Sequence, residues 1–479
     1  MSEITAAPDS LRDDPPAPAR QLRGNLGVAS IVFLVVAAAA PLGVIGGVVP
    51  LGLASGNGAG FPATFIISTI ILLLFAVGFT AMTPFVDEAG AFFSYVRKSL
   101  GMPAGIGIAF VAIVSYVALE AGVYGLLGPA GAAVVELVGG PALPWWLFAA
   151  LAFAVVTFLG YRNIELSSKV LGVLLTAEIA IVVVLDLVIV ARGGDQGLST
   201  GIIDPSAIVS GSLGIGLLFA IISYVGFEAT AIYRDEARTP ERTIPRATYV
   251  ALILIGVFYA VTSWALISGW GDAAAVARAT DSGGTFLGDT ASRYIGIVGA
   301  DIITVLYFTS LFACILAFHT IASRYLFALS QRDVLPESLS RPHVKHGSPH
   351  KASLWISGVV AVSVALAVVF QLDPAAQFYT WFAGATTVGV IVLLIATSVA
   401  VLAFFGKDRR GHSQWRVRIA PALGLVGLVG SLVLILANLD TLVGGSSLLA
   451  WVIVGLLVAA FAAGAVVGTR VRYSTVAQS

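Results

Sequence analysis

Long apolar runs separated by short polar connections dominate this sequence. Twelve of them are about 20 residues long, the length of helix that crosses the hydrocarbon core of a bilayer. The pattern therefore predicts an all-α integral membrane protein with 12 transmembrane helices. The expected spans cover residues 26–50, 61–86, 103–129, 144–161, 168–191, 209–233, 247–270, 296–326, 353–371, 378–404, 419–438 and 448–468.

The composition agrees with this pattern. The chain has 479 residues, of which 58% are hydrophobic and 11% charged, and its mean hydropathy is +0.97. A soluble domain carries about 25% charged residues, so most of this chain is expected to lie in lipid. Residues 1–25 are polar and rich in proline without an apolar core, which indicates a cytoplasmic tail and not a signal peptide.

The distribution of basic residues predicts the orientation in the membrane. With a cytoplasmic N-terminus and 12 spans, 23 of the 26 Lys and Arg residues fall in inside segments, and only Arg192, Arg278 and Arg293 fall outside. Cytoplasmic loops carry an excess of Lys and Arg. We therefore expect both termini in the cytoplasm of a multi-pass protein of the cell membrane. This topology accounts for the basic residues, so no nucleic-acid partner is expected.

Two of the apolar runs are interrupted in a similar way. The first contains Pro41 followed by Gly43, Gly46 and Gly47, and the sixth breaks at Ser223–Glu228. Proline and glycine weaken a helix, and a carboxyl group in mid-membrane is costly. Matched interruptions in two halves of a chain indicate a substrate site at the membrane midplane. The alternative is an ordinary proline kink, with glycines that let helices pack closely.

Several stretches resemble the amino acid–polyamine–organocation (APC) superfamily of permeases. The sixth-span segment 219–228 and the following Thr239–Arg246 look like the most recognisable family pattern, and segment 319–336 is similar to a second one. The early segment 39–43 and Phe92–Tyr95 also fit. These motifs are specific to the family, but they do not identify the substrate.

The resemblance implies a domain organisation and an activity. It implies a transport core over residues 26–404, built as a five-plus-five inverted repeat with discontinuous helices 1 and 6. The first repeat would cover about 26–191 and the second about 209–404. Helices 11 and 12 (405–468) and a cytoplasmic tail (469–479) would follow. The implied activity is secondary uptake of an amino acid, amine or related organocation by alternating access.

Broken helices could bind such a substrate through their backbone. Free N–H groups at the positive end of a half-helix would hold a carboxylate, and free carbonyls would hold an ammonium group. We expect the N–H groups near Leu42–Val44 and the carbonyls near Ile222–Val225 to do this, with Tyr224 or Phe227 closing over the ligand. The predicted substrate-binding residues are Ala40, Pro41, Leu42, Gly43, Val44, Ile222, Ser223, Tyr224, Val225, Gly226 and Phe227.

Three acidic residues within spans are candidates for proton coupling or gating. The family match places Glu228 at the inner gate; the alternative is a structural carboxyl group that caps N–H groups of the break. Glu178 lies where some proton-coupled relatives carry a lysine in place of a sodium ion. A proton is the favoured coupling ion there, with sodium or a structural role as alternatives. Glu120 either faces the cavity or bonds a neighbouring helix.

The remaining polar residues have simpler interpretations. We expect His319 to be packed and hydrogen-bonded, Asp186 and Asp301 to lie at the membrane interface, and Trp381 either to cover the site or to pack elsewhere. Ion pairs among Arg234, Asp235, Glu236 and Arg238 could latch a cytoplasmic gate. The single cysteine, Cys314, excludes an intrachain disulfide, and scattered His343, His346 and His350 are typical of a solvated loop.

The sequence shows no nucleotide-binding or hydrolase motif. We therefore expect no enzyme activity, no metal and no cofactor. The favoured function is a secondary active transporter that imports an amino acid or small organic amine, coupled to protons. The alternatives are an amino acid/amine exchanger of the same fold and a non-transporting substrate sensor.

Overall fold

The structure is a computed structural model that describes residues 26–86, 91–162, 168–228, 230, 237–332, 334–343 and 347–476. Within these residues the chain is helical, and its only β-type contact is an isolated bridge between Leu26 and Ala237. The α-helices are α1 (Val28–Ala38), α2 (Pro41–Gly43), α3 (Val49–Ser55), α4 (Phe61–Met82), α5 (Ala91–Leu100), α6 (Met102–Leu137), α7 (Trp145–Arg162), α8 (Ser168–Ala191), α9 (Pro205–Ile208), α10 (Leu213–Ile222), α12 (Pro240–Ser268), α13 (Asp272–Ser282), α14 (Phe286–Ser330), α15 (His350–Val369), α16 (Thr380–Lys407), α17 (Ala420–Ala437), α18 (Leu439–Leu442) and α19 (Ser447–Val476).

Short π-helical and 3₁₀-helical segments connect several of these helices. Three are π-helical: η1 (Val44–Val48), η7 (Pro374–Tyr379) and η8 (Trp415–Ile419). The others are the 3₁₀ turns η2 (Gly58–Gly60), η3 (Thr83–Phe85), η5 (Gly283–Thr285) and η6 (Glu337–Ser340). Single-turn π-helices often occur at functional sites, and η1 directly follows α2, the short helix that begins at the proline of the first interrupted span.

Eleven helical segments of the described chain are long and apolar enough to cross a bilayer. They correspond to eleven of the twelve expected spans. The expected span 209–233 is represented by α10, whose 10 residues are too few to cross alone. Residues 229 and 231–236 lie outside the described residues. The coarse prediction of an all-helical, multi-pass membrane protein is therefore confirmed.

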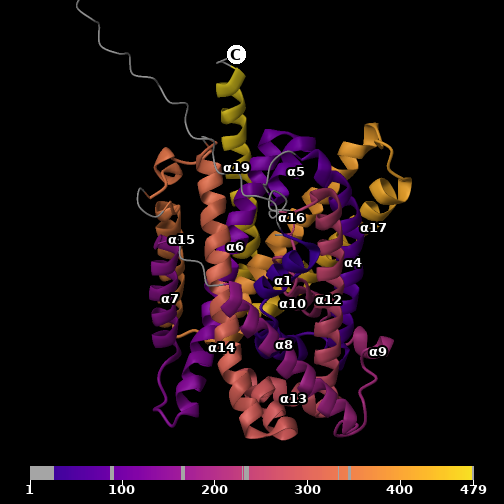
Figure 1. The fold of residues 1–479 in the computed structure, drawn as a ribbon, viewed down its shortest axis with the longest axis vertical. Coiled ribbons are helices and arrows are strands. Elements are labelled where there is room, and N and C mark those ends of the chain that lie inside the picture. The colour runs from indigo at the N-terminus through magenta and orange to yellow at the C-terminus, as the bar shows by residue number, and fades with distance from the viewer. Residues whose placement is uncertain are drawn as a thin grey trace, which may run out of the picture.

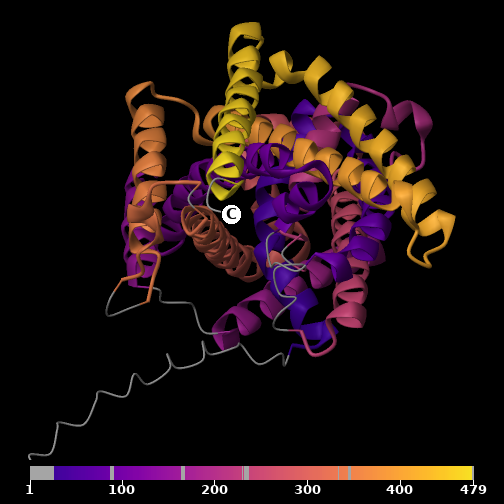
Figure 2. The same ribbon diagram turned by 90° about the horizontal axis from the view of Figure 1, so that it is seen from above.

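The helices form a central bundle with peripheral members on its sides (Figure 1). The long helices α6 and α14 run through the middle and contact each other, α1 packs against α14, and α10 packs against α3, α4, α16 and α17. α7 and α15 pack against each other at one edge, while α4, α12 and α17 lie at the opposite edge. Figure 2, a view turned by 90°, shows the same separation of the two edges.

Burial separates the central helices from the lipid-facing ones. In the most apolar 18-residue window of α6, 89% of the residues are buried within the protein, against 17% for α7. Both windows are apolar, so hydropathy alone does not tell these helices apart. Helix α6 is thus placed to contribute to an interior site, and α7 presents much of its surface to the membrane.

Candidate functional site

The first break lies between α1 and α2. Ala40 adopts a left-handed backbone (φ 46°, ψ 73°), and the chain returns to helical geometry at Pro41. The left-handed region is unfavourable for a residue other than glycine. The surrounding structure supports it, because the Tyr259 hydroxyl donates to the Ala39 carbonyl (3.2 Å). A proline at the first position of the new helix is favourable, because its missing N–H would have no partner there.

The second break follows α10. The helix ends at Ile222, and residues 223–228 continue as turns in which Gly226 has a φ of 111°. This conformation is accessible to glycine and strained for any side chain. Both interrupted spans therefore leave regular helical geometry at the positions where proline and glycine suggested they would.

The Glu228 carboxyl group closes this second break. Its Oε2 accepts from the Gly226 N–H (2.9 Å), and its Oε1 accepts from the Tyr116 hydroxyl of α6 (2.8 Å). The side chain is 3% exposed. This geometry is that of the capping alternative, and it also links the break to α6. A role in gating or proton transfer stays a prediction.

A cavity of about 40 Å³ lies where the two breaks meet. That volume exceeds what one water molecule needs. Its lining comes from both breaks and from α6, α14 and η7, and among the described residues that line it none carries a charged side chain. The lining residues are Ala38, Ala39, Ala40, Gly43, Val44, Val48, Leu119, Val123, Leu126, Ile222, Ser223, Val225, Leu311, Cys314, Phe318 and Tyr379.

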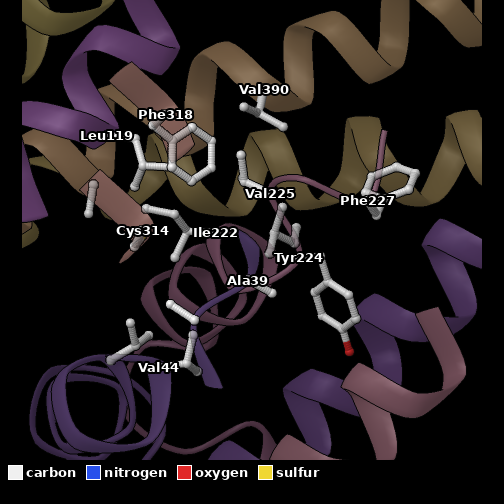
Figure 3. Close-up of a cluster of buried hydrophobic side chains, with 14 of the residues drawn as sticks. Ala39, Val44, Leu119, Ile222, Tyr224, Val225, Phe227, Cys314, Phe318 and Val390 are labelled. Carbon is white, nitrogen blue, oxygen red and sulfur yellow. The ribbon is translucent and has the colours of Figure 1, made fainter. Parts of the chain in front are cut away.

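Six of the eleven expected binding residues belong to this lining. They are Ala40, Gly43, Val44, Ile222, Ser223 and Val225. Figure 3 shows Ile222 facing Cys314, Phe318 and Leu119 across the space beside Ala39 and Val44. The remaining five are Pro41, Leu42, Tyr224, Gly226 and Phe227, which are absent from the cavity lining.

The two expected aromatic lids are engaged elsewhere. The Tyr224 hydroxyl points away from the cavity lining (Figure 3) and donates to the Phe65 carbonyl (2.9 Å), with Thr69 Oγ1 at 2.6 Å. Phe227 packs edge-on against Phe75, with ring centroids 6.1 Å apart. In this conformation neither ring covers the cavity. The aromatic residues of the lining are Phe318 from α14 and Tyr379 from η7, whereas Trp381, considered from the sequence, is not part of it.

The opposite wall of the cavity was not identified from the sequence. It is formed by Leu119, Val123 and Leu126 of α6 and by Leu311, Cys314 and Phe318 of α14. These residues recur at spacings of three and four, which places them on one helix face. The spacing marks the face but does not show that it borders a cavity, since packed faces have the same pattern.

The backbone groups at the breaks are only partly free. The Val44 N–H, expected to be available, donates to the Ala40 carbonyl (3.0 Å), so that expectation was wrong. The first N–H groups of a helix have no acceptor within it, and none is recorded among the described backbone for Leu42 or Gly43. In the second break the Ile222 carbonyl accepts from the Val225 N–H (3.1 Å). The Leu42 backbone interacts with the Glu178 carboxyl group, so the available donor narrows to Gly43.

Glu178 lies beside the first break. Its Oε2 accepts from the Ser310 hydroxyl of α14 (2.8 Å), and the carboxyl group also interacts with the Leu42 backbone. The side chain is 4% exposed. One carboxyl group on α8 thus contacts both α14 and the start of α2, although it is not part of the cavity lining.

Glu120 takes the second of its two predicted arrangements. It turns away from the cavity and lies against α14, where its Oε1 is 2.8 Å from His319 Nδ1. His319 Nε2 is 2.8 Å from the Ser353 hydroxyl of α15. The prediction that His319 is packed and hydrogen-bonded is confirmed, since the residue is 1% exposed.

Asp186 is packed within the protein. It is 7% exposed and accepts from the Thr262 hydroxyl (2.7 Å), and its position at the membrane interface stays a prediction. Asp301 is half-buried. The proposed cytoplasmic latch involves Arg234, Asp235 and Glu236, which lie outside the described residues.

Comparison with known proteins agrees with this architecture. The family model described as "Amino acid permease" matches residues 31–464. The branched-chain amino acid permease BcaP of Bacillus subtilis (strain 168) is 25% identical over 419 residues, covering 84% of this chain and 85% of the relative.

Two other curated relatives are similarly distant. BcaP of Lactococcus lactis subsp. cremoris (strain MG1363) is 21% identical, covering 78% of this chain and 81% of the relative. The serine/threonine exchanger SteT of Bacillus subtilis is 23% identical, covering 76% and 80% respectively. The family match spans most of the sequence and includes both breaks, so this chain belongs to the amino acid permease family of the APC superfamily.

Proposed function

We propose that this protein is a secondary active transporter that imports a neutral amino acid across the cell membrane by alternating access, coupled to protons. Both termini would lie in the cytoplasm, as the distribution of basic residues predicts. The proposal includes the five-plus-five inverted repeat, in which α1–α3 and α10 supply the two discontinuous segments.

The cavity between the two breaks is the observation that carries this proposal. The Gly43 N–H would hold the substrate carboxylate, favoured by the positive end of the helix that begins at Pro41. The Ser223 and Val225 carbonyls would accept from the ammonium group. These backbone groups would recognise the part of the substrate that all amino acids share.

The walls of the cavity favour a neutral, apolar substrate side chain. Val44, Val48 and Leu119 lie among the lining residues, and the lining contains no carboxylate among the described residues. A second ammonium group, as in a diamine, would be desolvated there without a counter-charge, which is costly. The cavity therefore supports an amino acid over an organic amine. Two relatives, both named branched-chain amino acid permeases, support the same substrate class.

Glu178 is our candidate for the coupling proton. Its recorded partners are the Ser310 hydroxyl and the Leu42 backbone, which act as donors to a carboxyl group. A sodium ion needs several oxygen ligands in place of such donors, so the arrangement favours a proton. Because Leu42 lies in the first turn of the helix whose Gly43 N–H would face the substrate, protonation of Glu178 would alter the binding site directly.

The energy available to such a coupling is sufficient. One positive charge moving down about 100 mV supplies about 2.3 kcal/mol, which corresponds to about fortyfold accumulation.

Uptake into proteoliposomes tests the proposal. Purified protein would be reconstituted and supplied with labelled L-leucine, L-valine, L-serine, L-arginine or putrescine, under an inward proton gradient, an inward sodium gradient or neither. Liposomes without protein are the control. We expect leucine and valine to accumulate under the proton gradient, and arginine and putrescine to remain near the control.

The alternatives predict different outcomes of the same experiment. Uptake that needs amino acid inside the vesicle and no ion gradient would make the protein an exchanger. The relative SteT is named as one. Binding without flux would make it a sensor. Preferential uptake of putrescine or arginine would overturn the substrate class.

A further inference from the structure

A buried polar cluster, to which the proposal above assigns no role, lies behind the cavity wall. It consists of Glu120 on α6, His319 on α14 and Ser353 on α15, and these side chains are at most 1% exposed. Their sequence neighbours Leu119 and Phe318 line the cavity. We infer that Glu120 and His319 form a proton-binding pair that exchanges its proton with one aqueous side of the membrane through Ser353. This inference rests on the proposed transport function.

The geometry connects the three side chains in a row. Glu120 Oε1 is 2.8 Å from His319 Nδ1, and His319 Nε2 is 2.8 Å from Ser353 Oγ. The other carboxyl oxygen, Oε2, is buried and has no hydrogen-bond partner among the described residues. The ionisable side chains near Glu120 are His319, Tyr124 and Cys314. On the far side of His319, α7 contributes Gly160 and α15 contributes Ser353.

Charge balance decides how many protons the pair holds. With one shared proton the pair is neutral, as a carboxylate with an imidazolium or as a carboxylic acid with an imidazole. Removing that proton leaves one net negative charge in the bilayer interior, where charge is strongly disfavoured. Because Oε2 has no hydrogen-bond partner among the described residues, no donor stabilises a negative charge on that oxygen. In this buried arrangement the pair therefore retains one proton.

Ser353 provides the route by which that proton leaves. While the pair is protonated, the His319 Nε2–H donates to the serine oxygen. A hydroxyl is both donor and acceptor, so Ser353 Oγ can take the Nε2 proton while its own proton passes to water that enters along the start of α15. The N–H bond and the original serine O–H bond break, a new serine O–H bond and a bond to the water oxygen form, and the new hydroxyl hydrogen then donates to Nε2.

The start of α15 leads towards an aqueous end of the bundle. His350 lies three residues before Ser353 and therefore on the same helix face. It packs edge-on against His343 with ring centroids 5.1 Å apart, and both rings also contact Tyr161 of α7. His343 and His350 are both half-buried. Topology predicts that this end of the bundle faces the cytoplasm.

The adjacent residue of α7 brings the cluster together. A Cβ atom on Gly160 would lie 2.7 Å from His319 Nε2 and 2.8 Å from Ser353 Oγ, closer than side-chain contacts allow. Only glycine lets α7 approach both groups at this point. The contact holds His319 and Ser353 beside the helix whose next residue, Tyr161, reaches the two histidines.

Measuring transport in two modes, one driven by a pH gradient and one without a gradient, separates proton coupling from substrate binding. The experiment measures labelled leucine in proteoliposomes, first as accumulation driven by a pH gradient and then as counterflow against internal unlabelled leucine without a gradient. For Glu120→Gln we expect accumulation to fall at least tenfold, while the rate and apparent affinity of counterflow stay within twofold of wild type. Glu136→Gln is the matched control, since Glu136 is exposed on the same helix.

Further variants keep the inference falsifiable if Glu120→Gln does not fold. Ser353→Ala retains the Glu120–His319 pair but removes the hydroxyl through which its proton leaves. Accumulation of leucine should therefore be slowed several-fold, with counterflow unchanged. Gly160→Ala should act in the same direction. Unchanged accumulation in Ser353→Ala and in folded Glu120→Gln, or equal losses in both modes, would show a structural role only. Absence of both modes in the wild type would instead refute leucine transport itself.

Discussion

The two breaks of the membrane-spanning helices are closed by different means. At the first break, Ala40 takes a left-handed conformation, and Pro41 starts the next helix at once. Backbone bonds close it, together with the Tyr259 hydroxyl on the Ala39 carbonyl and the contact of the Glu178 carboxyl group with the Leu42 backbone. At the second break, Gly226 turns the chain, and the Glu228 carboxyl group holds the turn to α6 through Tyr116.

This difference separates a fixed element from one that can change. The turn of the first break depends on backbone conformation, so Ala40 can keep it throughout a transport cycle, while the Glu178 carboxyl group acts on the adjacent Leu42 backbone. The second depends on one carboxyl group whose bonds change if its protonation or its α6 partner changes. We therefore expect the first break to define substrate affinity and the second to define conformational stability.

The largest effect is expected from Glu228→Ala. The substitution leaves the Gly226 N–H and the Tyr116 hydroxyl buried without an acceptor, at about 1–3 kcal/mol for each. The midpoint of thermal unfolding of the detergent-purified protein should fall well below that of wild type. Tyr116→Phe, which removes one of these donors, should have a smaller effect. A Glu228→Ala variant as stable as wild type would show that this carboxyl group does not hold the second break.

Ala40→Val should have the next largest effect. A left-handed conformation costs an ordinary residue about 1–2 kcal/mol, and a β-branched one more. We expect the initial rate of leucine uptake to fall about tenfold or more, as 1.4 kcal/mol implies. Ala37→Val, within regular α1, is the control. Equal uptake by both variants would mean that the first break is not required.

Tyr259→Phe tests how the first break is supported. It removes the hydrogen bond to the Ala39 carbonyl, worth about 1 kcal/mol. We expect a several-fold higher KM for leucine and a nearly unchanged maximal rate of uptake. If the maximal rate falls and KM is unchanged, the tyrosine acts on the conformational change instead of on binding.

Gly43→Ala should give the smallest but most selective change. The added Cβ would lie 3.2 Å from Leu311 Cδ2 and 3.3 Å from the Ala40 Cβ, which narrows the cavity by one methyl group. Leucine uptake should decline a few-fold more than alanine uptake. Gly288→Ala, where an added Cβ meets nothing within 4 Å, is the control. Equal declines for both amino acids would place the substrate side chain elsewhere.

The fold could be predicted from the sequence to a large extent. Runs of about 20 apolar residues are a direct consequence of bilayer thickness, and Pro41 and Gly226 mark backbone conformations that a regular helix does not adopt. Helix α10, which has 10 residues, shows the limit of this approach. An apolar run of spanning length does not reveal how much of it is helical.

Only the part of the site that the two breaks form could be predicted from the sequence. Phe318 and Leu119 form the opposite wall, but apolar residues in an apolar helix look the same whether they border a cavity or another side chain. The contact of Glu120 with His319 joins residues 199 positions apart, and no local pattern indicates such a pairing. Val44 was misassigned because the chain returns to hydrogen-bonded helix within one turn of the break.

Alkylation of the single cysteine tests the central claim most directly. Cys314 lines the cavity, and the chain has no other thiol, so a small membrane-permeant maleimide reports on this place alone in the reconstituted wild-type protein. We predict that a saturating concentration of leucine slows the labelling of Cys314, while putrescine does not. If leucine is transported and Cys314 is labelled at the same rate with and without it, the substrate does not occupy the cavity between the two breaks.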